Sequence, residues 1–260
     1  MFRAGLQRRP ACTSEEPKSI FSQPSPTVSV SHASEVAKLN AGVEAAKLVR
    51  NGMLLGLGTG STVSYALREL AERIKHDGLK VQGVATSVQT EGLAKELGIP
   101  LTSLEKHPRL DLDIDGADEV DPDLNLIKGG GGAHVREKIV AKASELVAIV
   151  VDESKLSRRL GEKSAVPVEV LPFALPLVTR EMSSLGGRCK LRMVKGLNEA
   201  FRTDNGNLIL DCDFGPIPEP DALEADIRSI PGVLESGIFH HVANLVIVGS
   251  SVGTRVIRRG

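Results

Sequence analysis

The stretch MLLGLGTGSTVSYALRELAERI, residues 53–74, decides the fold class. Met53 to Leu57 is a short apolar run that is typical of a buried parallel strand. The glycine-rich segment Gly58-Thr59-Gly60-Ser61-Thr62 follows, and Val63 to Ile74 then has the spacing of an amphipathic helix. The stretch therefore predicts a strand, a tight turn and a helix, in that order.

The same alternation continues on both sides of this stretch. Further strands are expected at 81–85, 110–114 and 146–151, and helices at 35–50, 88–97 and 133–146. Strands that alternate with helices predict right-handed βαβ crossovers and a parallel sheet covered on both faces. The apolar run LVIV at 245–248 is expected to return to this sheet as a further strand.

A different pattern begins after about residue 164. The expected order is strand, helix, strand, strand, helix, strand, at residues 167–171, 174–185, 189–194, 208–212, 220–229 and 233–239. Asn205-Gly206 is a strong hairpin signal between the two middle strands. This order predicts a small ferredoxin-like α+β domain inserted into the α/β domain.

Composition excludes several functional classes. The chain has 260 residues and a net charge of −1, so no global field attracts nucleic acid or an anionic membrane. Only 3% of the residues are aromatic, which argues against stacking on single-stranded nucleic acid, and no apolar run approaches the length of a membrane span. Cys12, Cys189 and Cys212 are few and widely spaced, so we expect no disulfide framework, no CxxC-type metal site and a reducing compartment.

Residues 1–33 form a leader of different character. They carry Arg3, Arg8, Arg9 and Lys18 together with many serines and prolines. One interpretation is an organellar transit peptide, although two adjacent glutamates argue against it. The other is a plain disordered segment. The compartment follows from this choice: plastid for a transit peptide, cytoplasm otherwise.

The glycine-rich turn between the first strand and helix is a candidate phosphate site. Backbone N–H groups at a helix N-terminus attract anions, and the hydroxyls of Thr59, Ser61 and Thr62 can donate to the same group. No GK[ST] follows, so the turn is not a Walker A loop, and it fits a dinucleotide fingerprint poorly. The alternative is a tight strand-to-helix turn with no ligand.

A second candidate site, Asp115-Gly116-Ala117-Asp118, follows the strand at 110–114. Loops at the carboxyl ends of parallel strands line the ligand crevice of an α/β sheet. Two carboxylates there can act as acid and base, bind sugar hydroxyls or hold Mg²⁺. The later acids at 119, 121 and 123 are expected to form a solvated turn.

A third candidate site is Lys128-Gly129-Gly130-Gly131-Gly132, which leads into a helix that carries Glu137. The glycines allow close approach to a ligand, Lys128 can neutralise an oxyanion, and Glu137 can be tuned as a general base. The alternative is a flexible loop before a surface helix. His134 is expected to have no functional role, because no partner defines one for it. Lys155 follows the strand at 146–151 and either binds a phosphate or a sugar hydroxyl or is a surface lysine.

Together these segments resemble ribose-5-phosphate isomerases of the A type. The resemblance runs from about residue 35 to 250 and rests on GLGTGST (56–62), DLDIDGADEVDPDLNLIKGGGG (111–132), REKIVA (136–141), PVEVLP (167–172), GG (186–187), TDNGN (203–207) and IPGV (230–233). It implies an α/β fold with a Rossmann-like catalytic domain, residues 34–164 and 239–260, and a smaller ferredoxin-like α+β domain, residues 165–238. It also implies that a homodimer interconverts D-ribose 5-phosphate and D-ribulose 5-phosphate in the non-oxidative pentose phosphate pathway, without a metal or nucleotide cofactor.

The resemblance also implies roles for individual residues. Glu137 matches the family's proton acceptor, which moves a proton from C2 to C1 through an enediolate. Lys128 and glycine N–H groups match the oxyanion site, and Asp115 and Asp118 match groups that bind hydroxyls and move protons between O1 and O2. The substrate-binding segments match Thr59, Gly60, Ser61, Thr62, Asp115, Gly116, Ala117, Asp118, Lys128, Gly129, Gly130, Gly131, Lys155 and, on the phosphate side, Lys38.

Three alternatives stay open from the residues alone. A non-catalytic sugar-phosphate sensor could use the same fold and phosphate turn, but it would not need Glu137 and Lys128. A Mg²⁺-dependent phosphotransferase could use the acid cluster. A related sugar-phosphate isomerase or deaminase is compatible with the fold.

Overall fold

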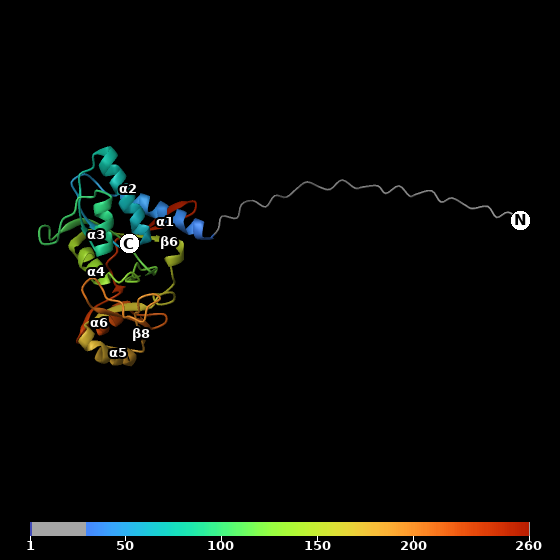
Figure 1. Ribbon diagram of the computed structural model, residues 1–260, viewed down its shortest axis with the longest axis vertical. Helices are drawn as coiled ribbons and strands as arrows, with labels where there is room; N and C mark the ends of the chain where they lie inside the picture. The colour runs from blue at the N-terminus through green and yellow to red at the C-terminus, as the bar shows by residue number, and fades with distance from the viewer. Residues whose placement is uncertain (2–29, 260) are drawn as a thin grey trace.

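A six-stranded sheet forms the upper part of the computed structural model, which describes residue 1 and residues 30–259 (Figure 1). Its strands lie in the order β13-β12-β6-β3-β1-β2, and all are parallel except β13. Their bounds are β1 Leu54–Leu57, β2 Gln82–Ala85, β3 Leu110–Gly116, β6 Ser144–Asp152, β12 Leu245–Ser250 and β13 Gly253–Arg258. The parallel sheet predicted from the alternating pattern is confirmed.

Helices cover both faces of this sheet. They are α1 Val30–Ala46, α2 Ser61–Asp77, α3 Val88–Glu96 and α4 His134–Ala143. Alternate residues of β6 show the two faces: Ala148 and Val150 pack in the cluster that contains α1 and α2, whereas Ile149 and Val151 pack with Ala141 of α4. This double burial is the reason that the strand is a continuous apolar run rather than an alternating one.

The strand order reverses at β1, which creates the crevice of the fold. The chain passes from β1 to β2 on one side and then crosses to β3 on the other, so that Leu57 of β1 pairs with both Ala85 and Ile114. The loops that follow β1 and β3 therefore separate above the same edge of the sheet. Ligands of open α/β sheets bind at such a switch point.

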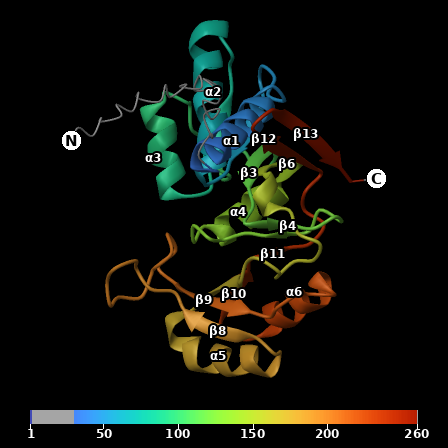
Figure 2. The ribbon, with the colours of Figure 1, turned by 90° about the vertical axis from the view of Figure 1, so that its right-hand side faces the viewer.

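The lower part of the molecule is a separate antiparallel sheet covered by two helices (Figure 2). Its elements are β7 Val166–Val170, α5 Leu175–Ser184, β8 Arg188–Leu191, β9 Leu208–Asp213, α6 Pro220–Ser229 and β10 Val233–Ser236, and short 3₁₀ turns lie at Glu153–Lys155 and Pro172–Ala174. The strand order β10-β7-β9-β8 confirms the predicted ferredoxin-like arrangement.

A three-stranded sheet joins the two parts and corrects one predicted strand. It contains β4 Glu119–Val120, β5 Leu126–Ile127 and β11 Ile238–Phe239. The single strand expected at 233–239 is wrong, because Gly237 divides it between two sheets. The carbonyl of Gly237 accepts a hydrogen bond from the Lys128 N–H at 2.9 Å, and a side chain at 237 would collide with the Lys128 carbonyl.

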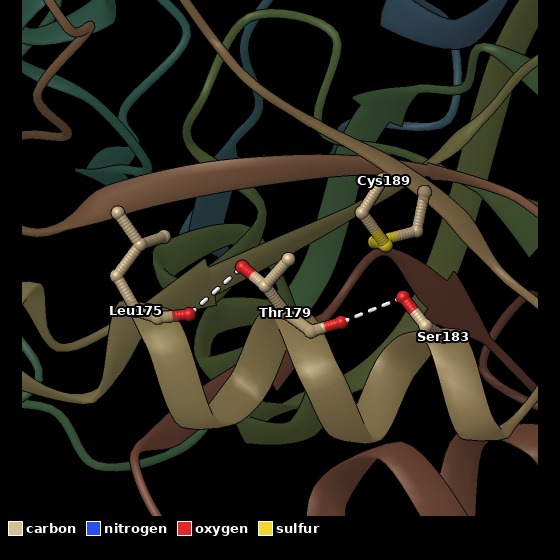
Figure 3. Close-up of a disulfide and its surroundings, with 5 residues drawn as sticks. Leu175, Thr179, Ser183 and Cys189 are labelled. Atoms are coloured by element: carbon tan, nitrogen blue, oxygen red, sulfur yellow. Dashed lines mark hydrogen bonds between the residues drawn. A yellow bond between two sulfur atoms is a disulfide. The ribbon is translucent and has the colours of Figure 1, made fainter.

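A disulfide joins Cys189 and Cys212, which contradicts the expectation that the chain has none. The two residues are direct partners across β8 and β9, with their Cα atoms 4.0 Å apart. Figure 3 shows the bond above α5, where the Thr179 hydroxyl donates to the Leu175 carbonyl at 2.8 Å. Sequence spacing could not reveal this pair, because only the strand register places residues 23 positions apart opposite each other.

The first described helix differs from its expected bounds. α1 begins at Val30 and ends at Ala46, whereas the pattern predicted 35–50 and a leader that extended to residue 33. The transit-peptide and disordered-leader interpretations fall on residues 2–29, which lie outside the described residues. Within residues 30–259, no helix combines the length and the apolar character that a bilayer crossing requires.

Candidate active site

A cavity of about 360 Å³ opens at the carboxyl ends of β1, β3 and β6. Its wall includes Lys38, Thr59, Gly60, Ser61, Thr62, Gly116, Ala117, Asp118, Lys128, Gly129, Gly130, Gly131, Glu137 and Lys155. The fold therefore brings together every residue proposed for the site from the sequence except Asp115, which lies directly beneath the wall and is 1% exposed.

The N-terminus of α2 faces this cavity without a capping side chain. Gly60 is the residue before the helix, its φ is +132°, and no side-chain hydrogen bond caps the first turn. The hydroxyls of Ser61 and Thr62 have no hydrogen-bond partner among residues 30–259. Free N–H groups and hydroxyls at a helix N-terminus can hold an anion such as a phosphate.

Thr59 has a different role from the one its sequence position indicates. Its hydroxyl lies 2.8 Å from that of Thr86, 2.7 Å from that of Ser87 and 3.0 Å from that of Thr90. Its N–H donates to Oδ1 of Asp115 at 3.0 Å. These polar groups therefore fasten the loop to the β2–α3 segment and to the strand below, so that they are not available to an anion.

Lys128 is buried, and its ammonium donates one hydrogen bond to a backbone carbonyl and forms ion pairs with two carboxylates. Its Nζ lies 2.6 Å from the carbonyl of Gly116, 2.9 Å from Oδ2 of Asp115 and 3.1 Å from Oε2 of Glu137. Burial by itself would lower the pKa of Lys128, but the two carboxylates reverse this and raise it above its ordinary value. Lys128 is therefore a permanent cation that holds two carboxylates in place.

Glu137 is the buried carboxyl group that reaches the cavity wall. It lies in the first turn of α4 and is 4% exposed. Burial raises its pKa to about 8, the charge of Asp115 acts in the same direction, and the nearby Lys128 opposes both. A carboxyl with a pKa near neutrality suits general-base catalysis, because it can accept a proton and release it again.

The two aspartates of the DGAD segment occupy different environments. Oδ1 of Asp115 accepts hydrogen bonds from the N–H groups of Thr59 and Gly116, and Oδ2 forms an ion pair with Lys128. Both oxygens of Asp115 therefore contact groups of the protein. Asp118 lines the cavity and accepts one hydrogen bond, at 2.7 Å, from the N–H of Gly130. Asp118 therefore keeps an oxygen for a ligand, whereas Asp115 acts through the groups that it holds.

Lys38 and Lys155 also line the cavity. The ammonium of Lys38 is 2.8 Å from Oε1 of Glu35 in the preceding turn of α1, and its side chain is 19% exposed. Lys155 ends the 3₁₀ turn after β6. Lys155 adds positive charge to the cavity wall, whereas Glu35 offsets the charge of Lys38.

Sequence reasoning missed four polar residues of the wall: Ser34, Gln89, Asp152 and Ser154. A signal for Asp152 existed, since it ends an apolar strand whose carboxyl end borders the crevice. Its Oδ1 accepts the N–H of Ser154 at 2.8 Å, so it also shapes the turn that carries Lys155. Ser34 and Gln89 lie on helices and had no comparable signal.

Asp113, on β3 beneath the site, is the most unusual buried group. It is 0% exposed, and neither carboxyl oxygen has a hydrogen-bond partner in the described part of the chain. A side chain at Gly56 would lie 2.5 Å from its Oδ1, so glycine is required there to leave room. Burial, followed by the charge of Asp115, raises the pKa of Asp113 well above its ordinary value.

Replacing Asp113 by asparagine is expected to reduce the pH dependence of stability. Because its pKa is raised on folding, the folded protein keeps a proton that the unfolded chain releases above about pH 3.9. Wild-type stability therefore falls as pH rises from there toward the folded-state pKa, by up to about 1.4 kcal/mol per pH unit, and Asp113→Asn removes this loss. Urea unfolding of both proteins from about pH 4 to 7 measures the free energy of unfolding at each pH. Identical pH dependence in the two proteins would contradict the prediction.

A larger cavity of about 870 Å³ lies elsewhere, between α4 and the small domain. Lys138 in its wall is neutralised by Glu224 at 2.6 Å and Glu235 at 3.0 Å. The wall of this larger cavity includes neither the N-terminus of α2 nor Glu137, so the size of a cavity does not by itself identify the site.

Comparisons with known proteins point to one family. The model of the family described as ribose 5-phosphate isomerase A (phosphoriboisomerase A) matches residues 82–253. The chain is 50% identical over 222 residues to ribose-5-phosphate isomerase A of Methanosarcina acetivorans, covering 85% of this chain and 94% of that one. It is also 50% identical over 209 residues to the Thermosynechococcus vestitus protein of the same name, covering 80% and 89%.

Solved structures show the same likeness. Ribose 5-phosphate isomerase A of Methanocaldococcus jannaschii superposes with a TM-score of 0.83 at 43% identity, over 87% of this chain and 100% of that one. A D-ribose-5-phosphate isomerase in complex with phospho-erythronic acid gives a TM-score of 0.84 at 41% identity, over 87% and 99%.

Proposed function

The chain belongs to the ribose 5-phosphate isomerase A family, and on that basis we propose that the cavity above β1 and β3 is its active site, with Glu137 as the catalytic base. The reaction is the interconversion of D-ribose 5-phosphate and D-ribulose 5-phosphate, a step of the pentose phosphate pathway. The observation that carries the assignment of Glu137 is a buried carboxyl at the cavity wall, 3.1 Å from the Lys128 ammonium.

The chemistry requires a base and a site for negative charge. The C2 proton of an aldose is weakly acidic, so a carboxylate must remove it while the charge that develops on O1 is stabilised. Glu137 takes this proton and returns it to C1 through an enediolate. N–H groups of the glycine loop stabilise the oxyanion, and the fixed charge of Lys128 lies nearby.

The two aspartates divide the remaining work. Asp118, which keeps a free oxygen at the cavity wall, binds the substrate hydroxyls and moves a proton between O1 and O2. Asp115 holds Lys128 and the N–H of Thr59, and so it positions the base and the phosphate loop rather than touching the sugar.

The phosphate group binds at the N-terminus of α2. N–H groups and the hydroxyls of Ser61 and Thr62 contact its oxygens, and Lys38 and Lys155 line the same cavity. Phospho-erythronic acid, the ligand of the solved isomerase, carries a phosphate and a carboxyl group. The reacting substrate likewise carries a phosphate and a second anionic group, the enediolate oxygen. Anchoring the phosphate orients the reacting carbons and supplies remote binding energy.

An isomerase assay in EDTA tests this function, and its pH dependence tests the base. Because burial raises the pKa of Glu137 to about 8, the free enzyme holds the base protonated at lower pH. We expect kcat/KM to rise about tenfold per pH unit from about pH 6.5 and to level off above about pH 8. A flat profile over this range would contradict the assignment.

His134 provides a matched control for the pH profile. Its ring is buried beside the glycine loop, and burial lowers its pKa to about 3, so it is already neutral throughout the measured range. Its Nε2 lies 3.3 Å from the Glu235 carbonyl, a contact that glutamine can reproduce. The His134→Gln variant should therefore keep the same midpoint, and a shifted midpoint would assign the profile to histidine.

Full loss of isomerase activity in EDTA would favour a metal-dependent enzyme.

Three further features are part of the proposal. The domain boundaries are set at 164/165 and 238/239, supported by changes of sheet nearby, where β7 begins at Val166 and where Gly237 separates β10 from β11. A homodimer is the assembly expected from the family, and sedimentation velocity measures it. The cytoplasm is the proposed compartment, supported by archaeal and bacterial relatives, and imaging of a tagged full-length chain checks it.

A further inference from the structure

Arg192 connects the small domain to the glycine loop of the proposed active site. It follows β8, and its Nη1 donates to the carbonyl of Gly129 at 2.8 Å and to that of Gly130 at 3.1 Å. Its Nε donates to Oδ2 of Asp211 at 2.9 Å, and its Nη2 pairs with the other oxygen of the same carboxylate. The side chain is 15% exposed, so a bidentate ion pair holds the guanidinium against the loop.

These contacts fix the direction of two peptide groups. In a trans peptide, the C=O and the N–H of the next residue point in opposite directions. Because Arg192 holds the Gly129 carbonyl, the N–H of Gly130 points away from it, and there it donates to Asp118 at 2.7 Å. Because Arg192 also holds the Gly130 carbonyl, the N–H of Gly131 is turned away from the small domain as well.

The N–H of Gly131 is left for a ligand. Gly131 lines the cavity, and its N–H has no acceptor within residues 30–259. Neighbouring peptides are already bonded, since the N–H of Gly132 donates to the Gly129 carbonyl at 2.9 Å. An unpaired backbone donor that faces a substrate cavity is the kind of group that stabilises an oxyanion.

The loop cannot hold this orientation by itself. Four consecutive glycines have no side chains to pack, and Gly129 and Gly132 adopt φ values of +106° and +80°. The small domain supplies the missing restraint: the Phe201 ring covers Gly132, and the guanidinium of Arg192 lies 5.9 Å from that ring.

We propose that Arg192 is a positioning residue of the isomerase, which orients the Gly130–Gly131 peptide so that its N–H faces the developing enediolate oxygen. The inference rests on the proposed function, because it needs an oxyanion at the glycine loop. It gives the small domain a direct part in the chemistry of a site built on the other sheet. Arg192 acts through the loop and does not itself contact the substrate.

Arg192→Met tests this with Arg188→Met as the matched control. Arg188 also pairs with an aspartate across β8 and β9, Asp213 at 2.7 Å, but it is 82% exposed and has no contact with the glycine loop in the described part of the chain. Since removing an oxyanion donor lowers kcat about 10²- to 10³-fold, misdirecting one by Arg192→Met should lower it about 10- to 100-fold. Arg188→Met should match wild type.

The split between kinetic parameters separates positioning from general damage. KM for ribose 5-phosphate and inhibition by inorganic phosphate should change less than about threefold in Arg192→Met, because the phosphate site at α2 is untouched. Arg192→Lys cannot reproduce the planar fork and should lose kcat as well. Asp211→Asn, which keeps the arginine and weakens its anchor, should give a smaller loss of the same kind.

Two outcomes overturn the inference. One is an Arg192→Met kcat equal to that of Arg188→Met, and the other is a loss of phosphate inhibition in proportion to kcat, which marks collapse of the whole site. If Arg192→Met does not fold, Asp211→Asn decides between the same outcomes. Failure of the proposed function is distinguishable, because wild type itself would then show no isomerase activity.

Discussion

Glu137→Gln is expected to lower kcat for isomerisation about 10²- to 10⁴-fold, the range for loss of a general acid–base group. The amide has the size of the carboxylate and can still present an oxygen to Lys128, 3.1 Å away in wild type, but it cannot accept the C2 proton. The fold and the phosphate site should persist. Initial rates with ribose 5-phosphate and calorimetric binding of the same substrate measure the two effects.

Glu145→Gln is the control for this variant. Glu145 is an exposed glutamate at the start of β6 and belongs to the wall of the larger cavity, not to that of the proposed site. It should leave kcat unchanged. A Glu137→Gln enzyme with wild-type turnover would exclude Glu137 as the base, whereas loss of both turnover and substrate binding would assign it a structural role.

Lys128→Met is expected to have the largest effect on stability, about 3–5 kcal/mol. Lys128 is 3% exposed, and it lies within 3.1 Å of carboxylate oxygens of Asp115 and Glu137. Its removal leaves the buried Asp115 carboxylate with no counter-charge, beside Glu137 and close to Asp113, whose oxygens already lack a partner. Urea unfolding near pH 7 measures the loss, and kcat should fall as well because the base is no longer held in place.

Lys138→Met is the matched comparison. Lys138 also contacts two carboxylates, those of Glu224 and Glu235, but it is 14% exposed and lies outside the proposed site. Its removal should destabilise the protein less, because solvent can screen the acids that remain. Adding Asp115→Asn to Lys128→Met should recover part of the stability. Equal losses in the two methionine variants would refute the counter-ion role of Lys128.

Local patterns predicted the parts of the fold that depend on neighbouring residues. The run at 53–74 has its apolar strand, glycine turn and amphipathic helix in one segment, and the structure places β1 and α2 there. Boundaries were less accurate where no turn separates two elements. Helix α4 ends at Ala143 and β6 begins at Ser144, so the predicted helix to 146 ran into the strand.

Long-range pairing accounts for what the sequence did not reveal. Cys189 and Cys212 are joined because two strands align, and Gly237 divides a strand because Lys128 lies against it. Arg192 is an ordinary arginine in the sequence, and only the approach of two domains places it on the glycine loop.

The motifs indicated the residues of the proposed site, but they did not show which role each residue has there. DGAD and KGGGG indicated one crevice, and the residues around them line one cavity. The contacts of each group could not be read from the motifs: the Thr59 hydroxyl bonds other hydroxyls of the protein, and Lys128 and Asp115 form an ion pair with each other and bond backbone groups. Such contacts depend on distances between loops that no spacing rule encodes.

Exchange of the C2 hydrogen of ribose 5-phosphate in D₂O is the most direct test of Glu137 as the proton carrier. Proton NMR should show wild-type enzyme converting the substrate, with solvent deuterium entering C1 of the ribulose 5-phosphate to the extent that the protonated Glu137 carboxyl exchanges with D₂O before it returns the proton. Glu137→Gln, saturated with the same substrate, should lose conversion and exchange together, by the same factor as kcat. Exchange at the wild-type rate in Glu137→Gln would show that another group removes the C2 proton, and would contradict the mechanism.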